Sequence, residues 1–507
     1  MRVYSAAEVR ELDRIASADF DLPVERLMEA AGAAVAEAAA GRLGPGGRCL
    51  VYAGAGNNGG DGFVAARRLR ERGLSAEVWL ALPPEKLAGA AKAAFERLGA
   101  AGVTVGRGAP PVLAKGDVAI DALLGTGLSR PPSGPFADAI EAMASGRARG
   151  AAVIAVDVPS GLDADRGVPL GACVRADATV TLAVRKRGLC LEPGASLAGE
   201  VAVADLGLPP AALARLRPRA ELLEERDVRA LFSPRPRDAH KGLFGHLLVV
   251  AGGPGKAGAA ALCARGALRG GAGLVTLASR PEVALSLWTL VPEAMAAPLP
   301  GEGPLSLADL PALRAALEGK SALAIGPGIP RGPETASLLG ALLEGFGGPA
   351  LLDADALNAL AEDPTLLRRA AGPVVLTPHP GEMARLCGEP VAELQADRLG
   401  VAERFAREHG VVVVLKGART VVAAPDGELS IVPTGNPGMA TGGTGDTLTG
   451  LVGALLAQRM EPRDAARAGA YLHGLAGDLA ARRHGERGLV ASDLGEALGE
   501  VWAAWRL

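Results

Sequence analysis

The chain has few aromatic residues and lacks the basic runs and long apolar runs that characterise nucleic-acid-binding and membrane proteins. Aromatic residues make up only 3% of its 507 residues, and the net charge is −3 with no Lys-rich run. Proteins that bind nucleic acids use basic surfaces and aromatic stacking platforms, so a nucleic-acid partner is not expected. No apolar run is long enough to span a bilayer and no signal-peptide pattern opens the chain. We therefore expect a cytoplasmic protein without a membrane partner.

Cysteine is scarce and scattered. The five cysteines include no C-x-x-C pair, which excludes the usual disulfide framework and the usual zinc-site spacing. Hydrophobic residues reach 49% and charged residues 21%, enough apolar material for large cores. These properties favour an ordered globular protein of at least two domains.

Apolar strand-like runs alternate with helix-like runs along the whole chain. This alternation is typical of a parallel sheet covered by helices on both faces. A Pro-rich, charged junction at 233–237 follows a change of rhythm near 207, and a new series opens at 247. We predict two α/β domains, 1–215 and 220–507. The predicted strands are 49–53, 76–82, 117–121, 152–157, 178–183 and 200–204, then 247–251, 273–278, 322–325, 350–353, 373–377 and 411–415.

The first functional segment is the glycine-rich stretch 54–62, directly after the apolar run 49–53. We expect a tight glycine loop there, because side chains would block the approach of a pyrophosphate. Its Asn57, Asn58 and Asp61 add oxygens for a ribose hydroxyl or a cation. Asp121 and Asp157 end two later strands, and the ends of parallel strands meet at one edge of a sheet. The alternative is ordinary strand-end turns, with Asp121 as a helix cap.

The N-terminal half resembles the NAD(P)H-hydrate epimerase family across residues 1–210. The resemblance rests on segments 27–32, 56–62, 121–128 and 156–161. It implies a Rossmann-like three-layer α/β/α fold, and a potassium ion on Asn58, Asp121 and Ser160. Oxygen ligands of this kind suit a hard alkali cation. Asp157 is also the candidate proton carrier. The implied substrate-binding residues are Asn57, Asn58, Gly59, Gly60, Asp61, Gly125, Thr126, Gly127, Leu128, Ser129, Arg130, Pro131 and Asp157.

The second functional segment is 436–446, a glycine-rich stretch before an apolar helix. Such a helix start points N–H groups at a transferring phosphoryl group, and Asp446 could accept a proton there. The alternative is a plain N-cap aspartate. The loop 416–420 follows a buried strand and could receive a nucleotide phosphate, although Lys416 could equally be a solvated turn residue. His379 lies in a Pro-locked turn, for which we favour ligand contact. No Walker A string is present.

The C-terminal half resembles the ADP/ATP-dependent NAD(P)H-hydrate dehydratase family, a branch of the ribokinase-like fold, across about 225–500. The resemblance rests on segments 240–246, 251–253, 258–260, 326–328, 353–358, 377–382, 415–417 and 436–446. It implies Asp446 as catalytic base, with the backbone of 442–446 as anion hole. The hydrate substrate would contact Ala259, Gly328, His379 and Asp446. The nucleotide would contact Lys416, Gly417, Ala418, Arg419, Thr420 and Gly445.

Together the resemblances imply repair of hydrated NADH and NADPH, with ADP or ATP as phosphoryl donor, Mg²⁺, and the potassium ion in the epimerase domain. The expected partners are these small molecules, and the protein is expected to be a homo-oligomer. One alternative is a ribokinase-like small-molecule kinase of the hydroxymethylpyrimidine type, which would release a phosphorylated product. Another is a nucleotide-sensing N-terminal domain, which would bind its ligand without exchanging the R and S forms.

Overall fold

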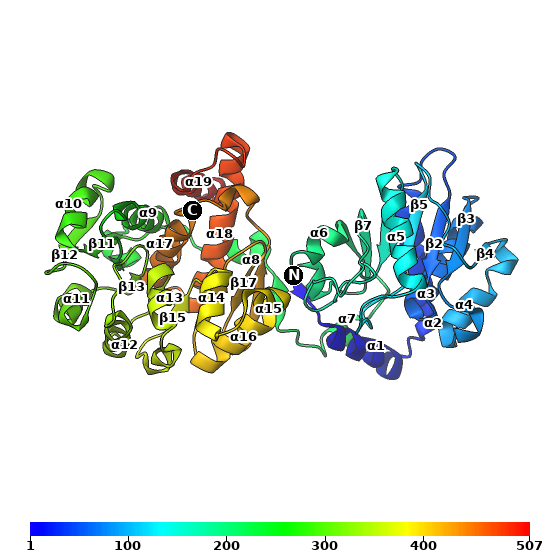
Figure 1. The fold of residues 1–507 in the computed structure, drawn as a ribbon, viewed down its shortest axis with the longest axis horizontal. Coiled ribbons are helices and arrows are strands. Elements are labelled where there is room, and N and C mark those ends of the chain that lie inside the picture. The colour runs from blue at the N-terminus through cyan, green and yellow to red at the C-terminus, as the bar shows by residue number, and fades with distance from the viewer. The chain divides into compact units, whose positions relative to one another are not determined.

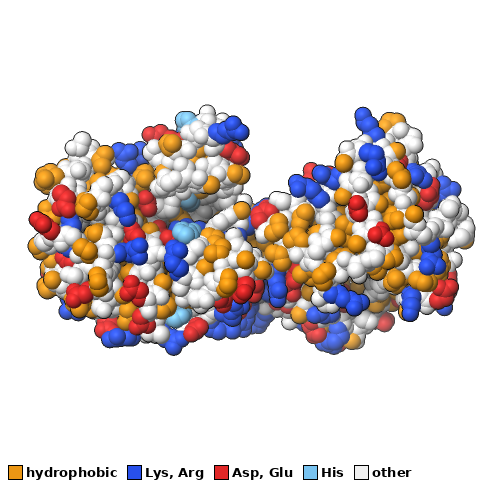
Figure 2. Space-filling view, in the orientation of Figure 1, with side chains coloured by type: hydrophobic (Ala, Val, Ile, Leu, Met, Phe, Trp, Pro, Cys, Tyr) orange, Lys and Arg blue, Asp and Glu red, His pale blue; other side chains and the backbone are white.

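The computed structural model describes residues 1–507, which divide into two compact units (Figure 1). The N-terminal unit comprises Arg2–Ala220, and the C-terminal unit comprises Glu221–Leu507 together with Met1. Both are α/β units built on largely parallel sheets, which confirms the predicted fold class. Acidic and basic side chains are interspersed on the face of each unit drawn in Figure 2. None of the helices combines the length and apolarity needed to cross a membrane.

The N-terminal unit has a parallel sheet in the order β4-β3-β2-β5-β6-β7-β8. The chain moves outward from β2 in one direction and from β5 in the other, so the strand order reverses between these two neighbours. Ligands of open parallel sheets bind at such a reversal, beside the strands' carboxyl ends. The strands are β2 (Cys49–Ala53), β3 (Ala76–Leu80), β4 (Thr104–Gly106), β5 (Val118–Ala122), β6 (Ala152–Val156), β7 (Ala178–Leu182) and β8 (Glu200–Ala204).

Helices cover both faces of this sheet, as predicted. Alternate strand residues point to opposite faces, so Cys49 and Val51 pack toward α2, α3 and α4, whereas Leu50 and Tyr52 pack toward α5. Burial on both faces explains why the strands are apolar throughout. The helices are α1 (Ala6–Phe20), α2 (Val24–Ala40), α3 (Asn57–Glu71), α4 (Gly89–Glu96), α5 (Pro135–Ala148), α6 (Gly194–Ala198) and α7 (Pro210–Leu213).

In the C-terminal unit the strands follow the order β9-β18-β17-β16-β15-β14-β13-β10-β11-β12. The pairs from β12 to β16 are parallel, and β17 and β18 add antiparallel neighbours. Strands β9, β12, β17 and β18 were not predicted from the sequence. The strands are β9 (Ala220–Leu222), β10 (His246–Val250), β11 (Leu274–Ser279), β12 (Met295–Pro298), β13 (Ala322–Ile325), β14 (Ala350–Leu352), β15 (Val374–Leu376), β16 (Val412–Leu415), β17 (Thr420–Ala423) and β18 (Leu429–Val432).

Two long-range helix contacts shape the core of this unit. A Cβ at Gly450 would overlap the carbonyl oxygen of Cys263, and one at Gly266 would overlap that of Thr447, so glycine lets α9 and α17 touch through their backbones. Figure 1 shows these two helices side by side. The helices are α8 (Glu225–Arg229), α9 (Ala257–Arg269), α10 (Pro281–Leu290), α11 (Leu310–Leu317), α12 (Thr335–Gly345), α13 (Ala354–Leu360), α14 (Pro380–Cys387), α15 (Val391–Ala396), α16 (Arg398–His409), α17 (Thr444–Ala457), α18 (Pro462–His484) and α19 (Ala491–Trp505).

Candidate functional site

The glycine segment of the N-terminal unit is mostly helix. Helix α3 begins at Asn57, so only residues 54–56 form the turn after β2, and the expectation of a glycine loop over 54–62 is wrong. Inside α3, a Cβ at Gly62 would lie 2.6 Å from the Cβ of Ala122, and one at Gly59 would overlap the Gly54 carbonyl. These glycines therefore let α3 pack closely on the sheet. The packing brings the N-terminus of α3, with its free N–H groups, to the strand ends.

A pocket of about 800 Å³ opens at this edge of the sheet. Residues from α1, α2, the start of α3 and the loop 123–130 line it, so it lies at the predicted place. Gly59, Gly60 and Pro131, predicted to bind substrate, are not among the lining residues; the two glycines are buried in α3. The other predicted substrate-binding residues line it: Asn57, Asn58, Asp61, Gly125, Thr126, Gly127, Leu128, Ser129, Arg130 and Asp157.

Two of the predicted potassium ligands, Asp121 and Ser160, are hydrogen-bonded to each other, and the third, Asn58, lines the pocket next to Gly125. Asp121 is fully buried and accepts hydrogen bonds from the Ser160 backbone N–H at 2.7 Å and the Ser160 hydroxyl at 2.5 Å. Burial raises the pKa of Asp121 to about 6, although the bonds from Ser160 oppose the rise. The Leu124 N–H donates to the Ser160 hydroxyl at 2.9 Å, and a Cβ at Gly125 would lie 3.3 Å from Asn58 Oδ1. The carboxyl ends of β5 and β6 thus meet the N-terminus of α3 here.

The Asn58 side chain carries a buried Nδ2 without a hydrogen-bond partner. Amide nitrogen and oxygen exchange places on a flip of the group, so Asn58 can turn either a donor or an oxygen toward a ligand. A buried polar atom left without a partner costs stability unless a ligand satisfies it. Together with the oxygens of Asp121 and Ser160, this donor set fits a hard cation such as potassium.

Asp157 occupies an unusual backbone conformation after β6. Its φ angle is +67°, in the left-handed region that a non-glycine residue rarely adopts. Its carboxylate accepts hydrogen bonds from the Leu182 N–H at 3.0 Å and from the ammonium group of Lys186. Lys186 is fully buried and also donates to the Leu182 carbonyl at 2.8 Å. Sequence reasoning did not select Lys186, since a lone lysine after a strand is usually a solvated residue.

In the C-terminal unit, Asp446 lies in the first turn of α17. The preceding Gly443 has a φ of +90°, which turns the chain sharply into the helix and leaves its first N–H groups facing outward. The pKa of Asp446 is raised to about 7, mainly by burial and also by the charges of Asp353 and Asp355, whereas the charge of Lys416 opposes the rise. A carboxyl with a pKa near neutrality is well suited to general base catalysis.

Lys416 is held over the start of α17 by an ion pair. Its ammonium donates to the buried Asp353 at 2.8 Å and lies 3.9 Å from Glu382. Asp353 also accepts a hydrogen bond from the Thr449 hydroxyl at 2.6 Å. A Cβ at Gly445 would lie 3.4 Å from the Lys416 nitrogen, so the cation faces the helix N-terminus. An anion at this place would meet both the ammonium and the N–H groups.

Arg398 shapes the predicted nucleotide loop 416–420. This buried side chain donates hydrogen bonds to the carbonyls of Ala418 at 2.6 Å and Leu415 at 3.2 Å. Burial lowers the pKa of Arg398 to about 10. Gly417 and Arg419 both have positive φ angles, 145° and 57°, so the loop turns tightly around the guanidinium. Sequence reasoning missed Arg398, because its spacing in α16 resembles that of any charged helix residue.

His379 stabilises the start of α14. It is the N-cap of α14, and its Nδ1 accepts hydrogen bonds from the N–H groups of Gly381 at 3.0 Å and Glu382 at 3.3 Å. Burial lowers the pKa of His379, and the charge of Lys416 lowers it further, so the ring is neutral near pH 7. With Nδ1 engaged, Nε2 carries the proton. Nε2 lies 3.3 Å from Glu382 Oε1 in a half-exposed side chain, and the predicted ligand contact of His379 stays a prediction.

The remaining predicted substrate residues, Ala259 and Gly328, lie against each other. A Cβ at Gly328 would lie 3.2 Å from that of Ala259, and the φ of Gly328 is +68°. Next to them, the Lys256 ammonium lies 3.1 Å from a carboxylate oxygen of Asp355, and the charge of Asp355 raises the pKa of Asp446. The ends of β13 and β14, the start of α9 and the start of α17 therefore surround one place, as the prediction requires.

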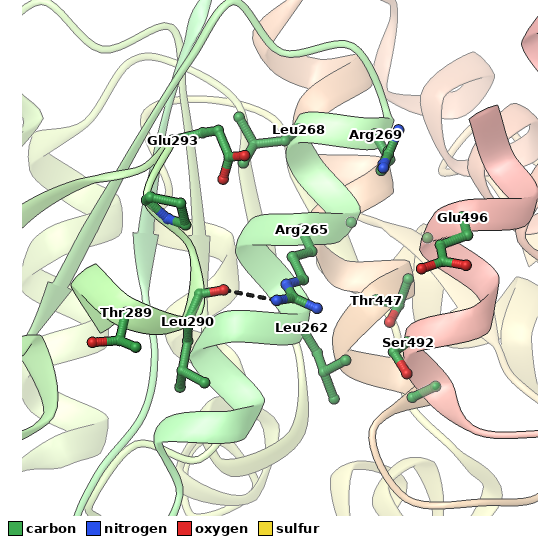
Figure 3. A pocket seen from close by; sticks show the side chains of 14 residues that line it. Leu262, Arg265, Leu268, Arg269, Thr289, Leu290, Glu293, Thr447, Ser492 and Glu496 are labelled. Atoms are coloured by element: carbon green, nitrogen blue, oxygen red, sulfur yellow. Dashed lines mark hydrogen bonds between the residues drawn. The ribbon is translucent and has the colours of Figure 1, made fainter. Parts of the chain in front are cut away.

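A second cavity of the C-terminal unit, of about 610 Å³, lies between α9, α10, α17 and α19 (Figure 3). Arg265 projects into it and donates a hydrogen bond to the Leu290 carbonyl at 2.8 Å, with Ser492 and Glu496 on the facing helix. None of the predicted site residues lines this cavity.

Comparisons with known proteins match both halves of the chain. The NAD(P)H-hydrate dehydratase family profile matches residues 247–499, and that of the YjeF-related protein N-terminus matches residues 24–188. The bifunctional NAD(P)H-hydrate repair enzyme Nnr of Moorella thermoacetica is 44% identical over 97% of this chain and 95% of its own length. The enzyme of the same name from Escherichia coli is 37% identical over 98% of this chain and 93% of its own.

Among solved structures, the ADP/ATP-dependent NAD(P)H-hydrate dehydratase of Bacillus subtilis, crystallised with ATP and Mg²⁺, is 35% identical. It matches 56% of this chain and 97% of its own, with a TM-score of 0.48. The sequence relatives carry the assignment, because they match nearly the whole of both chains at well over 30% identity. This chain belongs to the family of bifunctional NAD(P)H-hydrate repair enzymes.

Proposed function

We propose that this chain repairs hydrated NADH and NADPH, exchanging their R and S forms in the N-terminal unit and dehydrating the S form in the C-terminal unit. The observation that carries the proposal is Asp446 in the first turn of α17, beside Lys416 and the free N–H groups of the helix. A base, a cation and a helix N-terminus that can bind an anion therefore lie together at this site. The family membership of the whole chain supports both activities.

In the dehydration, the hydroxyl on C6 of the S form attacks the terminal phosphorus of ADP or ATP. Asp446 accepts the hydroxyl proton, while Lys416 and the N–H groups of 442–446 stabilise the charge on the transferring phosphoryl group. The new phosphate ester then breaks at its C6–O bond, and loss of a proton from C5 restores the double bond. Asp353 acts through Lys416, because its buried carboxylate fixes the position of the ammonium.

The nucleotide is proposed to bind at 416–420 and Gly445, and the hydrate at Ala259, Gly328 and the Nε2 edge of His379. A divalent cation such as Mg²⁺ commonly binds through one or two carboxylates plus the substrate's phosphates. Asp353, Glu382 and Asp446 are carboxylates of this site, and no cluster of three or more His, Cys, Asp or Glu side chains forms a protein-only metal site. The residues thus fit a Mg²⁺ ion that arrives with the nucleotide, where it would neutralise phosphate charge.

In the N-terminal unit the hydrate is proposed to bind in the 800 Å³ pocket, with its pyrophosphate at the start of α3. A potassium ion on Asn58, Asp121 and Ser160 would order the strand ends beneath it. Asp157 is proposed as a proton carrier. We also propose that the protein acts in the cytoplasm as a homo-oligomer, as the sequence suggested.

The test is to incubate the purified chain with mixed R and S hydrate, Mg²⁺ and either ADP or ATP, and to follow the absorbance of reduced nicotinamide. Full recovery of absorbance with release of inorganic phosphate is expected. A stable phosphorylated product would instead favour the small-molecule kinase.

The two activities can be separated by expressing residues 1–215 and 220–507 as independent proteins. The second protein alone should consume only the S form and then stall, apart from slow spontaneous exchange. Adding the first should carry the reaction to completion. Equally fast consumption of the R form by the second protein alone would contradict the division of labour.

A further inference from the structure

Two carboxyl groups of the N-terminal pocket, Asp61 and Asp157, have opposite surroundings. Both line the same cavity, Asp61 from the second turn of α3 and Asp157 from the end of β6. Both are almost fully buried, at 6% and 7% exposure. A buried carboxyl group is ionised only when donors or a cation stabilise its charge, so the partners of each group determine its state.

Asp157 has a full set of partners. The buried ammonium of Lys186, the Leu182 N–H and the Thr181 hydroxyl all donate to its Oδ1. Lys186 has no exposed surface, and it needs a negative partner because an unpaired buried charge is costly. The pair therefore holds Asp157 as a carboxylate whose second oxygen, Oδ2, accepts no hydrogen bond from the protein.

Asp61 has no donor. No protein group donates a hydrogen bond to its carboxyl, and burial raises the pKa of Asp61 well above its ordinary value. The charges of Asp157 and Asp13 raise it further, and that of Lys186 lowers it. Burial without a donor therefore favours the protonated form of Asp61, in the same cavity as a carboxylate that is paired with a buried ammonium group. This combination matches enzymes in which environment gives two carboxyl groups different roles.

We propose that Asp61 and Asp157 are the proton donor and proton acceptor of the epimerisation, and that Lys186 is the positioning residue that keeps Asp157 ionised. The inference rests on the proposed function of the N-terminal unit. It assigns Asp61 a chemical role beyond substrate binding. It also assigns a function to the buried ion pair of Lys186 and Asp157.

The proposed step breaks and re-forms the bond between C6 and its oxygen. Asp61 gives its proton to the C6 hydroxyl, the C6–O bond breaks, and the oxygen leaves as water. The lone pair of the ring nitrogen forms a double bond to C6, which carries the positive charge. A second water then adds to the opposite face of C6, Asp157 accepts one of its protons, and the electron pair returns to nitrogen. The proton passes from Asp157 back to Asp61 through water, so no oxidant or reductant is needed.

The charged groups around this reaction come from several elements, and all of them bear on its pH dependence. Asp61 must be protonated to act as the donor, so the rate should fall at high pH. Asp13, on α1 at the cavity, has a pKa raised by burial and lowered in part by Lys186. The charged lining residues are Arg10, Asp13, Asp61, Arg130, Asp157 and Lys186.

The first experiment measures R/S exchange by the full chain without nucleotide, so that dehydration does not run. Asp61→Asn and Lys186→Met should each lower kcat by about 10²–10⁴-fold while KM changes little, since both act on proton transfer. Lys186→Arg keeps the positive charge beside Asp157 and should restore part of the rate. The matched controls are the exposed Asp138→Asn and Lys92→Met, which should leave exchange unchanged.

The second experiment uses the unaltered protein, so it does not depend on whether a variant folds. Exchange in water labelled with oxygen-18 should place one heavy oxygen on C6 for each inversion, after subtraction of the enzyme-free reaction. Inversion without label would show that the C6–O bond stays intact and would overturn the proposal, as would wild-type kcat in Asp61→Asn. If the unaltered chain exchanged no R and S at all, the proposed epimerase function itself would be wrong.

Discussion

The ionisation of Asp446 should control the pH dependence of dehydration. Burial, together with the charges of Asp353 and Asp355, raises the pKa of this carboxyl to about 7. A general base works only when ionised, so kcat should rise with pH through the raised pKa and level off above it. For a pKa of about 7, the ionised fraction grows roughly tenfold between about pH 6 and about pH 8.

Two substitutions test this reasoning with the N-terminal activity as an internal control. Asp446→Asn keeps the shape of the side chain but removes the base, so nucleotide-dependent repair should fall by about 10²–10⁴-fold and lose its rise with pH. Asp355→Asn removes a negative charge that raises the pKa of Asp446, so the rise should move to lower pH. R/S exchange should be unchanged in both variants.

The assay is the initial rate of absorbance recovery from pure S hydrate with saturating Mg²⁺ and nucleotide. A rate independent of pH between about pH 6 and about pH 8 would refute the assignment of Asp446 as base, as would repair within a few-fold of wild type in Asp446→Asn.

Three further outcomes follow from the packing and the loops. Arg398→Met should raise the KM for nucleotide by about tenfold without changing R/S exchange, because it leaves carbonyls of the 416–420 loop without donors; an unchanged KM would contradict this role. Gly450→Ala should lower the free energy of unfolding by about 1–3 kcal/mol, measured by thermal or denaturant unfolding, because the added Cβ overlaps α9. The control Gly499→Ala on α19 should leave this free energy unchanged. Equal effects of the two substitutions would contradict the close backbone contact of α9 and α17. Asp121→Ala should slow R/S exchange and abolish its response to added potassium, and a wild-type protein indifferent to potassium would speak against the ion.

The sequence by itself determined the fold class and the family, and it predicted where each site should lie. Strands buried on both faces must be apolar throughout, so runs such as 49–53 and 411–415 are visible without a structure. Strands β1 (Arg2–Val3), β4, β9, β12, β17 and β18 were not predicted, because they are short, and a short apolar or mixed segment does not reveal its pairing partner. The glycine segment that begins at residue 54 was correctly placed at the end of a parallel strand, where parallel topology gathers ligands.

Only the tertiary structure decided what individual residues do there. The glycines at 59 and 62 pack a helix on the sheet rather than forming a loop, since the space beside them is set by residues distant in sequence. His379 caps a helix through Nδ1, and Lys416 is fixed by Asp353, a partner 63 residues away. The states of Asp61, Asp157 and Lys186 likewise depend on burial and on partners from separate elements. Protonation follows from the surroundings of a group in space, and local sequence does not specify those surroundings.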